Sequence, residues 1–321
     1  MNNQNYKWFI INLFVIMLFF VGCSIQPVQT SNWDSSIKVT EGIKCENICQ
    51  MKYYHSDNRN HWIMVEGNFG NNKKYPVVLD TGSPTAFIIN GVHVIENKLV
   101  INSSEVNDIF LHQKTCYIPE FDIGKVKLFN WNSFYTKSSV IKDNIILVGV
   151  PVLQKFNYIV FDNIKKKVEF SVEKDFECNQ SDLWFQYPFV IEEVGDNAFL
   201  FVKIPIAGEI IELQLDTGNG GGLALTEKLW DQIQKRIQVI KLEETKELYP
   251  YFGCFNCKHG IISNLNIGNM VINYAKVSVF PNDSSLMIGC QGMLGMQYFS
   301  DSVFVLDFKH NLMWIKNSSG K

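Results

Sequence analysis

Two short stretches of this sequence decide its fold: Val77–Ser83, which reads Val-Val-Leu-Asp-Thr-Gly-Ser, and Leu213–Asn219, which reads Leu-Gln-Leu-Asp-Thr-Gly-Asn. Each stretch places an Asp-Thr-Gly loop at the end of an apolar strand-like run, and Asp80 and Asp216 lie 136 positions apart. The glycine of each loop permits a sharp backbone turn where a side chain would clash. A loop that occurs twice raises the question of whether a larger unit is repeated around it.

Three further landmarks follow each loop in the same order. With the first copy named first, they are a glycine turn between two strands (Phe121–Val126 and Leu265–Met270), an apolar-Gly element (Ile146–Gly149 and Gly292–Gly295) and a terminal hairpin (Tyr158–Phe170 and Phe304–Ile315). Their separations, from 144 to 146 positions, exceed that of the loops. This growth predicts a longer helix in the second copy, where Thr226 can cap a segment with Leu229 and Trp230 on one face. A hairpin also precedes each loop, with turns at Gly70–Asn72 and Ala207–Gly208. The collinear order indicates a duplication.

The composition sets limits on the class of protein. A chain of 321 residues with 46% hydrophobic residues can bury one large core or two modest ones. A net charge of −3, with scattered charges, gives no electrostatic reason to expect nucleic-acid binding. We predict a mainly β protein with two related β-barrel or sandwich halves, residues 50–173 and 188–317, joined by a linker over 174–187.

The repeated loops predict a specific chemistry when they meet. Two carboxyls a few ångströms apart cannot both ionise, so Asp80 and Asp216 would share one proton. The ionised member can take a proton from a water molecule while the protonated member donates a hydrogen bond to a carbonyl. That arrangement hydrolyses an acyl bond without a covalent intermediate.

The two motifs resemble those of the aspartic proteases of the pepsin and retropepsin type. The resemblance implies a bilobal aspartic-protease-like fold made of two retropepsin-like halves in one chain, and a polypeptide substrate bound across both halves. It implies a catalytic dyad of Asp80 and Asp216 and no cofactor or metal. The implied supporting residues are those of the two loops and of the apolar-Gly elements: Thr81, Gly82, Ser83, Thr217, Gly218, Asn219, Gly149 and Gly295.

Two features depart from this pattern. Asn219 stands where Ser, Thr or Ala usually follows the glycine, and it leads into the glycine run Gly220–Gly222. Asn can still donate a hydrogen bond. The sequence also lacks a recognisable flap, the hairpin that covers substrate in this family, and Tyr117, Phe134 and Tyr135 are candidates to which we assign no role.

Other functions remain open at this stage. The same fold can serve as a catalytically inactive peptide-binding or scaffolding module, and the second loop can be a relic that only completes the core. A serine hydrolase based on Ser83 is disfavoured because no Gly-x-Ser-x-Gly elbow is present. We interpret the histidines as surface or loop residues: His55, His61, His93, His112, His259 and His310.

The cysteines allow two interpretations. Cys254, Cys257, His259 and Cys290 contain zinc-ligand residue types, but a second Cys pair at matching spacing is missing. A local disulfide between Cys254 and Cys257 is the alternative. We predict no metal site.

The N-terminal residues resemble an export signal. An apolar run from Trp8 to Val21, broken only by Asn12, ends in Phe20–Ser24, which is similar to the lipobox of bacterial lipoproteins. The resemblance implies a signal peptide over 1–22, lipidation of Cys23, a tether over 23–49, and a membrane-anchored protein of the bacterial cell envelope. An ordinary signal peptide or an uncleaved anchor with an incidental cysteine is the alternative.

Overall fold

The computed structural model describes residues 42–45, 48–52, 63–107, 112–136, 144–179, 183–249, 253–287 and 289–316. The predicted signal peptide and Cys23 lie outside these ranges. Within them, no helix is both long enough and apolar enough to cross a membrane.

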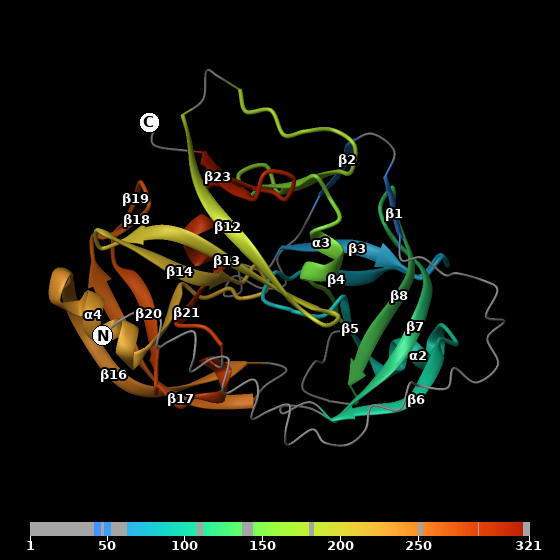
Figure 1. Ribbon diagram of the computed structural model, residues 1–321, viewed down its shortest axis with the longest axis horizontal. Helices are drawn as coiled ribbons and strands as arrows, with labels where there is room; N and C mark the ends of the chain where they lie inside the picture. The colour runs from blue at the N-terminus through green and yellow to red at the C-terminus, as the bar shows by residue number, and fades with distance from the viewer. Residues whose placement is uncertain are drawn as a thin grey trace. The chain divides into compact units, whose positions relative to one another are not determined.

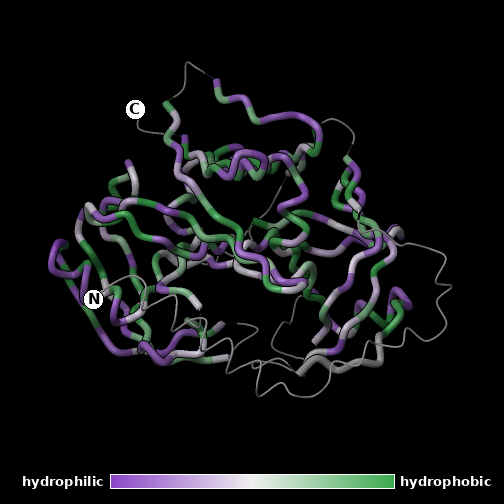
Figure 2. The backbone as a smooth tube through the Cα atoms, in the orientation of Figure 1, coloured by the Kyte–Doolittle hydropathy of each residue, from purple (hydrophilic) through white to green (hydrophobic). Residues whose placement is uncertain are grey.

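The first half contains strands β3 to β11 with two short helices (Figure 1). Their bounds are β3 (Met64–Asn68), β4 (Tyr75–Leu79), β5 (Phe87–Asn90), α2 (Gly91–Glu96), β6 (Val100–Asn107), β7 (His112–Ile123), β8 (Val126–Thr136), β9 (Ile146–Val148), α3 (Val150–Leu153), β10 (Tyr158–Asp162) and β11 (Lys167–Ser171). The order β8-β5-β9-β4-β3-β7 closes on itself because β7 also pairs with β8, which makes a six-stranded barrel. Figure 2 shows hydrophobic and hydrophilic residues alternating along the strands, as expected where one face of each strand is buried.

The second half repeats this order. Its elements are β12 (Trp184–Val194), β13 (Asn197–Ile206), β14 (Glu209–Leu215), β15 (Leu223–Thr226), α4 (Glu227–Ile233), η1 (Gln234–Arg236), β16 (Gln238–Tyr249), β17 (Gly253–Ser263), β18 (Leu265–Ile267), β19 (Met270–Ile272), β20 (Ala275–Phe280), η2 (Ser285–Met287), β21 (Gly292–Leu294), η3 (Met296–Phe299), β22 (Val303–Asp307) and β23 (Leu312–Lys316). The mainly β fold built from two related halves, as predicted from the sequence, is confirmed.

Local sequence signals account for several of these elements. The β13–β14 turn needs positive φ at Ala207 (50°) and Gly208 (83°), and Gly124 and Gly268 occupy the left-handed region at matching turns of the two halves. Thr226 caps α4, since its hydroxyl oxygen accepts a hydrogen bond from the Leu229 amide at 3.3 Å. Both the turns and the cap agree with the sequence prediction.

The extra length of the second copy lies mainly in a hairpin and only slightly in a helix. Helix α4 has 7 residues and α2 has 6. Strand β16 begins 138 positions after β6, whereas β18 ends 144 positions after β7 ends. The hairpin of β16 and β17 therefore accounts for most of the difference, and the predicted longer helix is corrected.

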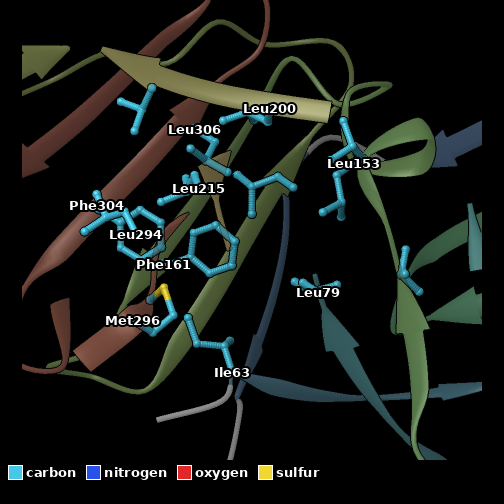
Figure 3. Close-up of a cluster of buried hydrophobic side chains, with 14 of the residues drawn as sticks. Ile63, Leu79, Leu153, Phe161, Leu200, Leu215, Leu294, Met296, Phe304 and Leu306 are labelled. Carbon is cyan, nitrogen blue, oxygen red and sulfur yellow. The ribbon is translucent and has the colours of Figure 1, made fainter. Parts of the chain in front are cut away.

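The two halves share a continuous sheet through their terminal hairpins. Strand β10 pairs with β22 in antiparallel register, and Val160 pairs with Val305, its own counterpart in the repeat. A local twofold axis therefore passes between these two residues. Phe161 and Phe304 stack beside it with ring centroids 4.5 Å apart. Figure 3 shows this pair among the buried side chains that include Leu79 and Leu215, the last residues of β4 and β14.

Three predictions outside the site need correction. The predicted tether up to residue 49 contains strand β1 (Gly42–Cys45), which pairs with β8, and part of β2 (Ile48–Lys52), which pairs with β11, because burial of Cys45 and Cys49 anchors these strands. Strand β12 begins inside the predicted linker, pairing with β23 from Trp184 onward.

The third correction concerns His93, which is buried in α2. The Asn90 backbone amide donates a hydrogen bond to its Nδ1 at 3.0 Å, and burial lowers the pKa of this imidazole to about 4. The side chain is therefore neutral at physiological pH and belongs to the core rather than to the surface.

Candidate active site

The two Asp-Thr-Gly loops meet at the boundary between the halves. Each aspartate directly follows its strand, β4 or β14, and its backbone amide donates to a strand of the same half: Asp80 to the Val148 carbonyl at 2.9 Å and Asp216 to the Leu294 carbonyl at 3.0 Å. Both strand pairs, β4–β9 and β14–β21, are parallel. The same backbone construction therefore presents the two carboxyls to each other.

Reciprocal hydrogen bonds between the threonines lock the loops together. The Thr81 amide donates to the Thr217 hydroxyl at 2.9 Å, and the Thr217 amide donates to the Thr81 hydroxyl at 3.0 Å. Each hydroxyl in turn donates across the boundary, Thr81 to the Leu215 carbonyl at 2.7 Å and Thr217 to the Leu79 carbonyl at 2.5 Å. Both threonines are completely buried. These four bonds fix the relative position of the two aspartates.

Each loop glycine lies against the carboxyl of the opposite half. A Cβ atom added to Gly82 would lie 2.3 Å from the Asp216 carboxyl, and one added to Gly218 would lie 2.4 Å from the Asp80 carboxyl. Any side chain at these positions would therefore displace the opposite aspartate. Close approach, rather than an unusual backbone conformation, explains why both positions hold glycine.

The apolar-Gly elements pack behind the loops. A Cβ atom on Gly149 would lie 2.0 Å from the Thr85 carbonyl oxygen, and one on Gly295 would lie 2.4 Å from the Gly221 carbonyl oxygen. The Gly149 amide donates to the Ala86 carbonyl, and the Gly295 amide donates to the Gly222 carbonyl, each at 2.9 Å. Both glycines therefore support the backbone just after the loop.

Burial and mutual proximity perturb both carboxyls. Burial raises the pKa of Asp80, while a hydrogen bond from Asp216 and the backbone amides of Gly82 and Ser83 act in the opposite direction. Burial raises the pKa of Asp216 well above its usual range, and the negative charge of Asp80 raises it further. Both pKa values are raised, so the pair holds one shared proton and titrates as a unit.

The residues after the two glycines bond to their own loops. Two backbone amides donate to Asp80 Oδ1: that of Gly82 at 2.9 Å and that of Ser83 at 3.2 Å. The Ser83 hydroxyl contacts Thr85, two residues on, at 3.4 Å. The Asn219 side chain likewise accepts a hydrogen bond two residues on, from the Gly221 amide at 2.7 Å. Among the residues that the structure describes, the Ser83 hydroxyl contacts only Thr85 and not a histidine.

The hairpin of β16 and β17 was missed by the sequence analysis. Burial raises the pKa of the phenol of Tyr249, the last residue of β16, and the nearby carboxylates of Glu247 and Asp216 raise it further. Its hydroxyl makes no hydrogen bond of good geometry among the described residues, with the Asn219 side chain nearby. Strand β16 is rich in Lys and Glu and is mostly exposed, so its sequence carries no buried-strand pattern. The hairpin of β6 and β7 holds the matching position in the first half (Figure 1).

The three aromatic candidates lie elsewhere in the first half. The Tyr117 hydroxyl on β7 donates to Asn130 Oδ1 at 2.5 Å. Phe134 and Tyr135 belong to β8, where they pair with Ile88 and Ile89 of β5. The described contacts of these three residues therefore lie within the first-half sheet.

Comparisons with known proteins found similar solved structures but no sequence match. The chain is similar to the solved structure of basic 7S globulin from soybean, with 10% identity over 85% of this chain and 97% of that chain and a TM-score of 0.47. It is also similar to the solved structure of edgp, with 7% identity over 84% of this chain and 94% of that chain and a TM-score of 0.48. No protein-family model matches the chain. No curated protein matches it either.

These comparisons correct one sequence prediction. Identification as a member of the pepsin and retropepsin family with a bacterial lipoprotein signal was wrong, because the two short loop motifs are not accompanied by a match to any family model or curated protein.

Proposed function

We propose that this protein hydrolyses peptide bonds with a water molecule activated by Asp80 and Asp216. The observation that carries the proposal is the reciprocal placement of the two loops, in which each glycine lies against the opposite carboxyl. A carboxyl pair buried in this way shares a proton and can act as base and acid at once. Structural residues that only complete a core have no need for this arrangement.

The shared proton gives the two aspartates complementary roles. The ionised carboxyl accepts a proton from the attacking water, while the protonated carboxyl donates its proton toward the carbonyl oxygen of the scissile bond. The tetrahedral intermediate then collapses as the amine leaving group takes up the proton that came from the water, and one hydroxyl returns its proton to the carboxylate that had donated it. No covalent bond to the protein forms, so the mechanism requires no nucleophilic side chain. The proposed substrate is a polypeptide in extended form that contacts both halves.

Binding without hydrolysis is the second candidate function. The Asn219 side chain is held by the Gly221 amide, in a loop followed by three glycines, and no hydroxyl follows the second Asp-Thr-Gly. A loop less firmly ordered around Asp216 would place the water poorly, and a misplacement of about 1 Å can reduce a rate by about 100-fold. The same surface would then retain peptides intact.

A peptide-library assay separates the two candidates. The purified full chain is incubated with diverse peptides from acid to neutral pH, beside Asp80→Asn, Asp216→Asn and the exposed-site control Asp283→Asn. Hydrolysis predicts cleavage at acid pH that falls by about 1,000-fold or more in both dyad variants and stays unchanged in the control. Peptides retained intact by the wild type would favour the binding function. Cleavage by Asp216→Asn at the wild-type rate would contradict the two-carboxyl mechanism.

A further inference from the structure

Three side chains with metal-ligand chemistry gather on the hairpin of β16 and β17. The ligand atoms of Glu247, Cys257 and His259 all lie within 4.8 Å of one another. The distance from Cys257 Sγ to Glu247 Oε2 is 3.9 Å, and that from His259 Nε2 to the same oxygen is 3.2 Å. Neither the dyad nor the threonine lock uses these residues.

Strand geometry explains why these three residues meet. Cys257 and His259 are two positions apart on β17, so their side chains point to the same face of the hairpin. Thr245 of β16 pairs with Cys257, and Glu247, two positions further along β16, lies on that face as the diagonal neighbour of Cys257. Cys254 is three positions from Cys257 and points to the opposite face, where it is exposed and unpaired. The sequence alternatives that joined Cys254 to Cys257 are therefore wrong.

We infer that Glu247, Cys257 and His259 form a binding site for Zn²⁺. Thiolate, imidazole and carboxylate are the three ligand types of zinc, at about 2.3, 2.0 and 2.1 Å respectively. Tetrahedral geometry at those bond lengths places ligand atoms about 3.3 to 3.8 Å apart, so the present distances require only small side-chain movements. Three protein ligands leave the fourth position for water or for Glu243, which pairs with His259 across the hairpin.

The surroundings of the three residues suit a cation. The Cys257 side chain is buried beside Phe280 and Met293, whereas about half of the His259 side chain is exposed. An ion can therefore enter from the exposed His259 side and bind next to the buried apolar side chains around Cys257. In the metal-free protein the Cys257 thiol points at Glu247 Oε2, to which it can donate its proton across 3.9 Å. Binding of Zn²⁺ would displace this proton, with release of one H⁺ for each thiolate–zinc bond formed.

Metal binding at this place would cross-link the two strands of the hairpin. Glu247 is two residues from Tyr249, which lies on the same face and close to Asp216. A bound ion would therefore order the strand end beside the second Asp-Thr-Gly loop. The inference itself concerns binding and does not depend on whether the dyad is hydrolytic.

Metal binding is measured directly on the full chain after treatment with a chelator. Zn²⁺ is titrated in competition with a chromophoric chelator, and Co²⁺ is used as a spectroscopic substitute. We expect one Zn²⁺ per chain, and a thiolate-to-Co²⁺ charge-transfer band with the visible bands of a tetrahedral site. Cys257→Ser, His259→Gln and Glu247→Gln should each weaken binding by at least about tenfold. Cys254→Ser is the matched control, because it removes a thiol from the other face of the same strand.

The variants differ in how much they can disturb the fold, and this separates loss of a ligand from loss of structure. His259→Gln changes a largely exposed side chain, so loss of binding in that variant cannot be attributed to disruption of the core around Cys257. Hydrogen exchange of the β16 and β17 amides should slow when Zn²⁺ is added to the wild type and remain unchanged in His259→Gln. Absence of the charge-transfer band, equal affinity in Cys257→Ser and the wild type, or equal losses in Cys254→Ser and Cys257→Ser would overturn the inference. The three residues would then form an ordinary His–Glu hydrogen bond beside a buried thiol.

Discussion

The two Asp-Thr-Gly loops share one backbone but differ in their surroundings. In both halves the side chain after the loop glycine makes a hydrogen bond to the residue two positions further along the chain, Ser83 to Thr85 and Asn219 to Gly221. In the second half, Tyr249 at the end of β16 is partly buried and lies near Asp216, and burial together with the Asp80 charge raises the pKa of Asp216 well above its usual range. Duplication thus preserved the interlocked centre, where each half needs the other, while the surrounding hairpin diverged.

The largest effects are expected where the halves depend on each other most directly. Gly82→Ala and Gly218→Ala each place a methyl group within about 2.4 Å of the opposite carboxyl. We expect kcat/KM for peptide cleavage to fall by at least about 100-fold in both variants, because the dyad geometry is displaced. The reciprocal contacts predict similar losses in the two halves, measured by steady-state kinetics.

Gly91→Ala provides the control for this comparison. A Cβ atom at Gly91 meets its nearest neighbour at 3.8 Å, an ordinary contact, and the residue lies at the start of α2. Its activity and stability should therefore remain close to those of the wild type. Tolerance of alanine at Gly218 but not at Gly82 would show that the second loop does not approach Asp80 as described.

The threonine lock predicts the next largest effect, on stability. Thr81→Val removes a hydroxyl that donates to the Leu215 carbonyl and accepts from the Thr217 amide, so two buried polar groups lose their partner. We expect unfolding free energy to fall by about 2 to 5 kcal/mol, since each buried unsatisfied group costs about 1 to 3 kcal/mol. Thr217→Val should cost a similar amount, measured by urea denaturation.

Serine substitutions test whether the hydroxyl carries this effect. Thr81→Ser and Thr217→Ser keep both hydrogen bonds and lose one methyl group, at a cost of about 1 kcal/mol. If valine and serine were equally destabilising, the methyl packing rather than the lock would hold the halves together.

The shared proton predicts that one substitution stabilises the fold in a pH-dependent way, in contrast to the destabilising substitutions above. Because both carboxyl pKa values are raised above 3.8 in the folded state, folding takes up protons as pH rises above that value, and stability falls as pH rises toward the folded-state pKa values. Asp216→Asn removes one of the two charges that would be forced together. Its melting temperature should exceed that of the wild type by a few degrees at neutral pH and match it near pH 3, where both states are protonated.

Calorimetry over this pH range checks the sign. For the exposed control Asp283→Asn, the difference in melting temperature from the wild type should not change with pH. A variant Asp216→Asn that gains stability equally at acid and neutral pH would show that the effect does not come from the shared proton.

The sequence predicted the site better than its surroundings for a physical reason. The loops and the turn at Ala207–Gly208 are determined by residues adjacent in the chain, whose backbone requirements are visible in the motif itself. The zinc-ligand cluster and the position of Tyr249 depend on pairing between β16 and β17, and the charged residues of β16 are compatible with a helix, a loop or an exposed strand. Burial of His93 was missed because a single histidine in a helix carries no periodic signal. Two short motifs also implied a family membership that the rest of the sequence does not support.

The smallest expected effects concern the two residues that distinguish the loops. The Ser83 hydroxyl makes only long contacts of 3.4 Å with Thr85, whereas Asn219 accepts a short hydrogen bond of 2.7 Å. Ser83→Ala should therefore cost less than about 0.5 kcal/mol and Asn219→Ala about 1 kcal/mol, by the usual net value of a hydrogen bond. Neither side chain bonds to an aspartate in the described contacts, so kcat/KM should change by less than about tenfold in both. A much larger loss of kcat/KM in Asn219→Ala than in Ser83→Ala would mean that the Asn219 side chain orders the loop around Asp216. Asn219 would then contribute to activity, although Ser, Thr or Ala usually occupies this position.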